Sequence, residues 1–217
     1  MNHVLEVDSV QLEFDGRKIL SDIHVKCETG KITGLLGRNG AGKSCLMKII
    51  YGSLACEKSV RFDHVSVLES FRQPDLLMYL PQFNFIPKSL SLRRVFRDFE
   101  LDYKSFQNRF PEFEARERYS IGNFSGGERR LIELYVIVKS ASLFALLDEP
   151  FTHLNPIQIE KVKELLKEEK ANKGLFITDH LYRHVIDICD GLYVMTSQQT
   201  YLTKSITDVE AFGYTRI

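Results

Sequence analysis

The sequence predicts an α/β fold with a mostly parallel sheet, a small antiparallel β segment at the N-terminus and an inserted helical segment. Four runs are almost continuously apolar, as expected of strands covered on both faces: Ile32–Leu36, Leu76–Leu80, Leu143–Leu147 and Leu175–Thr178. The N-terminal stretch instead alternates apolar and polar residues, which favours half-buried antiparallel strands. Residues 83–123 carry short amphipathic pieces such as SLRRVFRDFE, which predict small helices.

The alternation of apolar and polar residues predicts the first strands. Val10, Leu12 and Phe14 fall on one face, and Asp15-Gly16 signals the turn into a second alternating run. Beyond the last apolar run we expect a helix after His180 and a hairpin from Leu192 to Lys204. Residues 1–217 then form one domain, with a core made of 1–82 and 124–217 and a helical insertion at 83–123.

Composition and charge limit the classes of protein to consider. The chain has 217 residues, 44% hydrophobic and 27% charged, enough for one sizeable core. Its 29 basic and 29 acidic side chains cancel, so no overall field attracts nucleic acid or an anionic membrane. We therefore expect no nucleic-acid partner.

The N-terminus and the cysteines favour a cytoplasmic setting. MNHVLEVDSVQLEF carries acids and lacks the basic start and apolar core of a secretory signal. No apolar run approaches the ~20 residues that a membrane helix needs. The four cysteines form no CxxC pair, so reduced thiols are the simplest expectation. Any membrane contact is expected to be made through a partner.

Each of the four apolar runs ends in residues suited to a site. A glycine loop follows Leu36, Pro81-Gln82 follows Leu80, Asp148-Glu149 follows Leu147, and Asp179-His180 follows Thr178. In open α/β sheets, ligands bind beyond the carboxyl ends of the strands. The four endings therefore predict one shared site.

The glycine loop GRNGAGKS, Gly37 to Ser44, matches the phosphate-binding pattern GxxxxGK[ST]. Its glycines let successive backbone N–H groups curl around a polyphosphate, and the following helix directs its positive end at it. Lys43 can reach the β- and γ-phosphates, and Ser44 can ligate Mg²⁺. The position between a buried strand and a helix favours this interpretation over a glycine turn with a surface lysine. By itself the loop leaves kinases, GTPases, helicases and transporter motors open.

A second unusual helix start lies in NFSGGERRLIELYVIV, Asn123 to Val138. Ser125 and Glu128 form an S-x-x-E capping box. Gly126 and Gly127 leave the first turn bare, so a phosphate or another molecule could approach closely. Taken alone, the pattern also fits a well-capped helix with no further role.

GRNGAGKS, FSGGE and LLDEP occur in the order found in the ATP-binding-cassette (ABC) family, and FSGGE resembles the LSGGQ signature of that family. The resemblance spans Val4 to Ile206. It implies an ABC ATPase fold built on a P-loop NTPase core, with ATP and Mg²⁺ as cofactors. It also implies head-to-tail pairs in which each ATP lies between the P-loop of one copy and the signature of the other.

The resemblance also implies the nucleotide-binding residues. Phe14 stands where the family carries an aromatic that stacks on adenine, although a strand core residue is the alternative. The P-loop would cradle the phosphates in cis, and the signature would reach the γ-phosphate in trans. The full set is Phe14, Gly37, Arg38, Asn39, Gly40, Ala41, Gly42, Lys43, Ser44, Cys45, Ser125, Gly126, Gly127 and Glu128.

Four residues are implied to be catalytic: Lys43, Gln82, Glu149 and His180. Gln82 resembles the Q-loop glutamine that reaches Mg²⁺ and the attacking water, with an ordinary turn residue as the alternative. Glu149 would orient and deprotonate that water. His180 matches the switch histidine that contacts the γ-phosphate; the spacing to His184 could suggest two metal ligands, but HExxH and a third ligand are missing.

The metal ligands implied for Mg²⁺ are Ser44, Gln82 and Asp148. Asp148 and Glu149 would repel each other in a buried site unless a cation compensates them. Mg²⁺ and Lys43 can supply that compensation.

Three positions depart from the usual family sequence. Cys45 replaces a threonine that would donate to the α-phosphate, and Glu128 replaces a glutamine, placing a charge near the trans nucleotide. Asn155 replaces the aspartate of the D-loop, which the resemblance places across the dimer near the opposite P-loop. Followed by Pro156 and Gln158, it is placed to cap a helix over Ile157–Ala171, and Asn caps about as well as Asp. Each change could slow hydrolysis, yet the catalytic residues remain.

The leading function is therefore the ATPase subunit of a membrane transporter whose channel is a separate chain. Two alternatives stay open: a soluble ABC-type ATPase acting on the ribosome or DNA, and a non-catalytic nucleotide-binding regulator. The first usually has a coiled coil or tandem cassettes, which this chain lacks. Intact Glu149 and His180 argue against the second.

Overall fold

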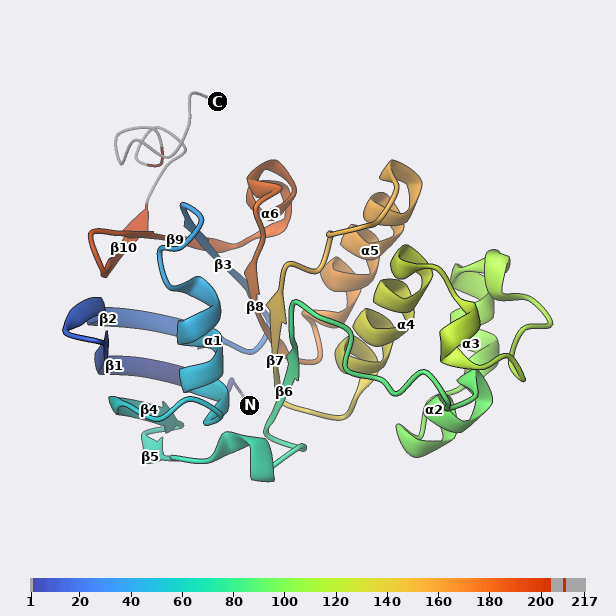
Figure 1. Cartoon of the computed structure of the whole chain (residues 1–217), viewed down its shortest axis with the longest axis horizontal. Helices are drawn as coiled ribbons and strands as arrows, with labels where there is room; N and C mark the ends of the chain where they lie inside the picture. Colours follow the sequence, from blue (N-terminus) through green and yellow to red (C-terminus); the bar gives the residue numbers. More distant parts are fainter. Residues whose placement is uncertain (1, 204–208, 210–217) are drawn as a thin grey trace.

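The computed structural model describes residues 2–203 and residue 209. Lys204 and Ile206, where the predicted hairpin and the resemblance end, lie outside them. The described chain forms a four-stranded sheet, a six-stranded sheet and a group of helices at the end remote from the four-stranded sheet (Figure 1). The predicted fold class is confirmed, while the boundaries at 82/83 and 123/124 stay predictions.

The N-terminal sheet is antiparallel, in the order β2-β1-β4-β5. β1 (Val4–Phe14) and β2 (Arg17–Glu28) are joined at Asp15-Gly16, whose φ angles of 49° and 75° confirm the predicted turn. A register shift near Ser9, at φ 54°, resets the alternation, so that Val7 and Val10 both face the core.

Two strands of this sheet were not predicted. β4 (Glu57–Phe62) pairs with β1, and the short β5 (Val65–Ser66) pairs with β4. The 3-10 turn η1 (Ser70–Arg72) follows. The β4 sequence EKSVRF contains only two apolar residues, so pairing with β1 rather than its own pattern makes it a strand.

The central sheet has the order β10-β9-β3-β8-β7-β6. The four predicted apolar runs are its parallel strands: β3 (Ile32–Gly37), β6 (Leu77–Leu80), β7 (Phe144–Asp148) and β8 (Gly174–Thr178). β9 (Gly191–Thr196) runs parallel to β3 and forms the predicted hairpin with β10 (Gln199–Thr203). All residues of β3, β7 and β8 are buried, which explains why these runs do not alternate.

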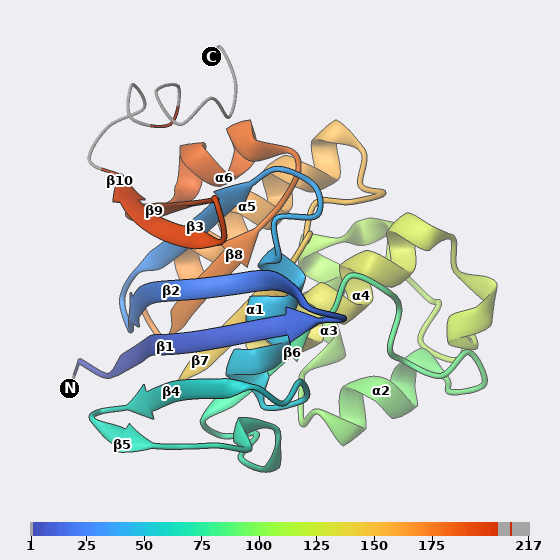
Figure 2. The same cartoon turned by 60° about the vertical axis from the view of Figure 1, so that its left-hand side comes forward.

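Each face of the central sheet has its own core. Leu35, Leu146 and Phe176 pack with α1 (Lys43–Tyr51) and the antiparallel sheet. The next residue in each strand points the other way, toward the helices on the opposite face. These helices are α4 (Gly126–Lys139), α5 (Pro156–Glu169) and α6 (Tyr182–Ile188), and α1 lies between the two sheets (Figure 2).

The predicted helical insertion contains α2 (Leu92–Asp98), α3 (Tyr103–Arg109), and the 3-10 turns η2 (Pro111–Phe113) and η3 (Ile121–Asn123). Its core is aromatic. The ring of Phe106 lies 4.7 Å from that of Phe113 and 4.8 Å from that of Tyr135 on α4. The insertion therefore packs on the helix that begins with FSGGE.

The predicted capping box at Ser125 and the predicted cap at Asn155 are both present, and the cap at Asn155 is also a capping box. The Ser125 hydroxyl accepts from the Glu128 N–H, and the Glu128 carboxylate accepts from the Ser125 N–H. At α5, Gln158 N donates to Asn155 Oδ1 at 2.9 Å, and Asn155 N donates back to Gln158 Oε1 at 3.2 Å. The helix starts at Pro156, one residue before the predicted start, and ends at Glu169.

Candidate functional site

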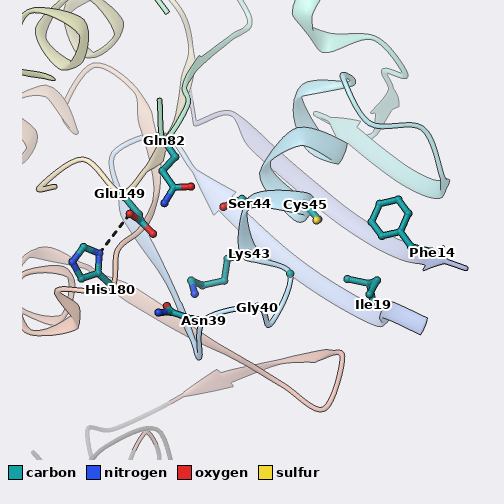
Figure 3. A pocket seen from close by; sticks show the side chains of 11 residues that line it. Phe14, Ile19, Asn39, Gly40, Lys43, Ser44, Cys45, Gln82, Glu149 and His180 are labelled. Carbon is teal, nitrogen blue, oxygen red and sulfur yellow. Dashed lines mark ion pairs between the residues drawn. The ribbon is translucent and has the colours of Figure 1, made fainter. Parts of the chain in front are cut away.

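The carboxyl ends of the central strands open into a cavity of about 630 Å³ (Figure 3). Its lining comes from the N-terminal sheet, the P-loop and three strand endings. The lining residues are Phe14, Ile19, Asn39, Gly40, Gly42, Lys43, Ser44, Cys45, Gln82, Glu149 and His180. Ile19 is the only one of these that the sequence did not single out, because an isolated isoleucine in a strand carries no pattern of its own.

The P-loop is shaped by left-handed glycines. Gly40 and Gly42 have φ angles of 79° and 104°, which other residues adopt at a cost. A Cβ on Gly42 would also lie 2.7 Å from Leu20 Cδ2. The helix that follows has Gly42 at its N-cap and no side-chain cap, so its first N–H groups are available to a ligand. Gly37, Arg38 and Ala41 belong to the loop without lining the cavity.

Lys43 is buried at the base of the loop. Its Nζ donates to the carbonyl oxygens of Gly37 at 2.6 Å and Arg38 at 3.2 Å. Burial lowers the pKa of Lys43, and the nearby carboxylates of Glu149 and Asp148 oppose that effect without cancelling it. A phosphate near this ammonium would raise that pKa again, because a negative charge favours the protonated form.

The carboxylate oxygens of Asp148 are suited to bind a divalent cation. The side chain is 1% exposed; Tyr79 Oη donates to its Oδ2 at 3.2 Å, and Oδ1 has no hydrogen-bond partner among the described residues. Burial raises the pKa of Asp148, and the nearby hydroxyl of Ser44 opposes that effect without cancelling it. An orphaned buried carboxylate oxygen beside a serine hydroxyl fits Mg²⁺, which prefers hard oxygen ligands.

Glu149 turns away from the line of β7. Its φ of 53° is left-handed, and its N–H donates to Thr178 O at 2.7 Å on β8. The carboxylate accepts from Thr152 Oγ1 at 3.2 Å and lies 3.5 Å from His180 Nδ1 (Figure 3). The backbone therefore directs this acid into the cavity, while Asp148, one residue earlier, stays beneath it.

Two buried charged residues to which the sequence assigned no role of their own hold these endings together. Asp179 accepts from Phe151 N at 2.9 Å and Leu181 N at 2.8 Å, fixing the turns after β7 and β8. Arg130 of α4 donates to the carbonyl oxygens of Pro81 at 2.6 Å, Glu149 at 2.9 Å and Asp148. For Arg130, the sequence offered one signal of such a role, because a charged side chain stands at the start of a largely apolar helix.

Phe14 stands at the end of β1 and is 48% exposed. It lines the cavity rather than the core, so the strand-core alternative is wrong. An exposed aromatic face beside a phosphate loop suits stacking on a planar base.

The signature residues lie outside the cavity of their own chain. Gly127 has a local reason to be glycine, because a Cβ there would lie 2.5 Å from His153 O. At Gly126, a Cβ would meet nothing within 4 Å. The chain itself therefore does not explain why the first turn of α4 is bare at Gly126.

Glu128 presents less free charge than the sequence suggested. Burial raises its pKa, but hydrogen bonds from Arg116 and the Ser125 N–H outweigh this and leave the pKa below the usual value. The carboxylate is thus ionised, capped and paired with Arg116.

The sequence model of the ABC transporter family matches residues 20–152, more than half of the chain. This chain belongs to the ABC transporter family. Among its relatives are lipopolysaccharide export system ATP-binding proteins, LptB. That of Haemophilus influenzae is 28% identical over 208 residues, covering 88% of this chain and 86% of the relative. That of Escherichia coli K12 is 31% identical over 200 residues, covering 84% and 83%.

Solved structures share the ABC ATPase fold. An ATP-binding subunit of an ABC transporter superposes with a TM-score of 0.80 at 21% identity, covering 97% of this chain and 94% of its own. A nucleotide-free ATP-binding cassette gives 0.79 at 19% identity, with the same coverages. The family match and the LptB relatives show that the chain is an ABC-type ATPase subunit that binds nucleotide. None of the helices among the described residues has the length and hydrophobicity that crossing a membrane requires.

Proposed function

We propose that this chain is the ATP-hydrolysing subunit of a transporter whose membrane-spanning part is a separate polypeptide. The observation that carries the proposal is the division of the site. One cavity gathers the P-loop, Gln82, Glu149 and His180, while the signature of the same chain lies outside it with Gly126 open. Such a half-site is suited to completion by a second cassette, a second copy of this chain or a paired ATP-binding domain, arranged head to tail.

Within the cavity each side chain has a separate task. The P-loop N–H groups and Lys43 bind the phosphates, and Phe14 stacks on the adenine. Ser44, Asp148 and Gln82 would hold Mg²⁺, which supplies neutralisation of phosphate charge. Glu149 accepts a proton from the attacking water, and His180, 3.5 Å from Glu149 Oε2, holds that carboxylate in place.

The second cassette would contribute Ser125, Gly126 and Gly127, whose helix start offers N–H groups to the γ-phosphate. Glu128 supports that helix start through its capping bonds and its pairing with Arg116. Both nucleotides would then be buried between the two cassettes, and hydrolysis would release the pair.

The membrane partner would dock on the helical insertion at 83–123, holding the subunit at the cytoplasmic face of the membrane. Phe83 is 64% exposed, Phe85 37% and Tyr119 48%, so this segment presents three aromatic side chains to solvent. The similarity to LptB covers most of both chains, which supports a transporter role over the ribosome- or DNA-directed alternative. We expect no nucleic-acid partner.

The catalytic assignment is tested by Glu149→Gln. Because the amide cannot accept the proton of the attacking water, we expect ATP hydrolysis to fall by about 10²-fold or more while ATP still binds. Steady-state phosphate release and equilibrium ATP binding measure the two effects. Equal hydrolysis rates in the variant and the wild type would overturn the assignment.

The partner assignment is tested by extraction from the source in mild detergent. A transporter subunit retains a polytopic membrane protein, whereas a ribosome or DNA factor retains nucleic acid. Substituting Phe83 and Phe85 by serine should release the membrane protein. Retention of that protein by the substituted chain would place the docking surface elsewhere.

A further inference from the structure

The loop that carries Gln82 is attached to the signature helix by one buried carboxylate. Glu133 of α4 is fully buried, and its Oε1 accepts from Phe85 N at 2.9 Å and Ile86 N at 3.1 Å. Its Oε2 accepts from Asn84 Nδ2 at 2.9 Å. Among the described residues, the hydrogen bonds that the structure assigns to 82–86 all end on this side chain.

A carboxylate in this position has a cost that its contacts must offset. Glu133 lies in the run LIELYVIV between the fully buried Ile132 and Leu134, where a leucine would satisfy the packing. Burying an ionised carboxylate is unfavourable unless it is paired and hydrogen-bonded. Three N–H donors from one loop offset that cost. Glu133 therefore holds the loop in place at a position where an apolar side chain would only fill space.

The same helix holds the loop on the other side of Gln82. Arg130, one turn before Glu133, donates to Pro81 O at 2.6 Å and to Glu149 O at 2.9 Å. Gln82 is thus fixed between a bond at Pro81 and bonds at Asn84 to Ile86. Since α4 begins at Gly126, the signature, the Gln82 loop and Glu149 are all linked through this helix.

We propose that Glu133 is a positioning residue that places Gln82 in the catalytic site. It also transmits displacement of the signature helix to the Gln82 loop. The inference rests on the proposed function, in which the signature contacts the nucleotide of a second cassette. Phe83 and Phe85, the proposed contacts for the membrane partner, lie in the same tethered loop. Nucleotide engagement and partner docking would therefore act on the same carboxylate.

The test compares two substitutions of similar size in the full-length chain. Glu133→Gln keeps an acceptor for the Phe85 and Ile86 N–H groups and can still bond Asn84, whereas Glu133→Met removes all three bonds. We expect Glu133→Met to lower kcat for ATP hydrolysis about tenfold or more and to leave KM for ATP unchanged, with Glu133→Gln near the wild type. Hydrogen exchange at residues 82–86 should accelerate only in Glu133→Met.

A double substitution separates positioning from general destabilisation. If Glu133 acts through Gln82, Glu133→Met should cause no further loss of kcat in a Gln82→Ala background. Unchanged exchange at 82–86 in Glu133→Met would overturn the tether, and an equal loss of kcat with and without Gln82 would overturn its action through Gln82. Gln82→Ala could have full activity while Glu133→Met still accelerates exchange at residues 82–86. In that case the role proposed for Gln82 fails, and the positioning role of Glu133 fails with it. The bonds from Glu133 to the loop would still be supported. Lost activity in Gln82→Ala with full activity in Glu133→Met would overturn the inference alone.

Discussion

Asp148 is the residue at which function and stability conflict. Burial raises its pKa, and one of its carboxylate oxygens has no partner among the described residues. An acid whose pKa is higher in the folded state contributes stability that is present below the pKa of the unfolded chain and is lost as pH rises through the folded-state pKa. Ionisation of this side chain in the nucleotide-free protein therefore costs folding free energy.

We predict that Asp148→Asn stabilises the nucleotide-free protein at pH 7 by about 1 kcal/mol, or roughly 3 °C in Tm, because the substitution removes the buried charge. The gain should vanish below about pH 4, where the aspartic acid is protonated in both states. Thermal unfolding across this pH range measures it.

Asp8 provides the control with the opposite sign. Its hydrogen bond from Arg61 holds the pKa of this carboxyl below the usual value despite partial burial. Asp8→Asn should therefore destabilise the protein at pH 7, with the effect disappearing in acid. Loss of stability in both variants at pH 7 would contradict the argument for Asp148.

Phe14 is predicted to contribute to nucleotide affinity and little to stability. Phe14→Ala should weaken ATP binding about tenfold, since stacking of an aromatic on a base is worth about 1–3 kcal/mol. Tm should change little, because the ring is 48% exposed. Titration with a fluorescent ATP analogue measures the affinity, with Phe14→Tyr as the control that keeps stacking. A large fall in Tm with unchanged affinity would show that Phe14 contributes to stability and not to nucleotide binding.

At the residue scale, the sequence predicted groups that would act on a ligand and missed the groups that hold them in place. Lys43, Asp148 and Glu149 fall in patterns whose spacing reflects phosphate and metal chemistry. Arg130 and Glu133 act through backbone groups of Pro81 and Phe85 to Ile86, remote in sequence. Such bonds produce no fixed spacing in the sequence, because any backbone carbonyl or N–H can serve as the partner.

At the scale of elements, the start of α5 shows a side chain whose capping role does not depend on its charge, whereas its functional role could. Asn155 caps this helix with its side-chain oxygen, and the Gln158 side chain returns the bond. An aspartate would keep the acceptor and add a charge next to the proposed interface between cassettes. The cap and the interface therefore make different demands on the same side chain.

We predict that Asn155→Asp changes the ATPase rate and leaves the free energy of unfolding within about 0.5 kcal/mol, because the two residues cap equally well. Asn155→Ala is the matched control and should cost about 1 kcal/mol. Chemical denaturation and steady-state hydrolysis measure the two quantities. A large loss of stability in Asn155→Asp would show that the capping argument is misplaced.

Elements were predictable where local pattern and global position agree. The strands β3, β7 and β8 are apolar throughout because both faces are covered, and α5 carries its own start signal. β4 and β5 were missed because the first has few apolar residues and the second has two residues in all. β4 pairs with β1, which precedes it by more than forty residues, and β5 pairs only with β4 among the described residues.

At the scale of the whole molecule, the fold places the two halves of the proposed site on different parts of the chain. The cavity lies at the carboxyl ends of the central strands, and the signature starts a helix that packs on the insertion. In the proposed pair, a chain built this way would contribute a P-loop to one composite site and a signature to another. Two copies related by a twofold axis would complete both sites.

This arrangement predicts complementation between two inactive variants. Lys43→Ala disables the P-loop, and Gly126→Asp places a negative charge at the bare start of α4, where a Cβ meets nothing within 4 Å of its own chain. Each variant alone should hydrolyse little ATP. In an equimolar mixture, half of randomly formed pairs are mixed and hold one intact site of two, so activity should return to about one quarter of the wild-type rate.

Phosphate release by the mixture, compared with each variant at the same total concentration, measures the recovery. A third variant with both substitutions in one chain is the control, because mixing it with either single variant leaves no intact site. Recovery with the double variant, or a mixture as inactive as its components, would contradict the head-to-tail pair. Full activity in Gly126→Asp alone would instead show that the open space beside Gly126 serves no second cassette.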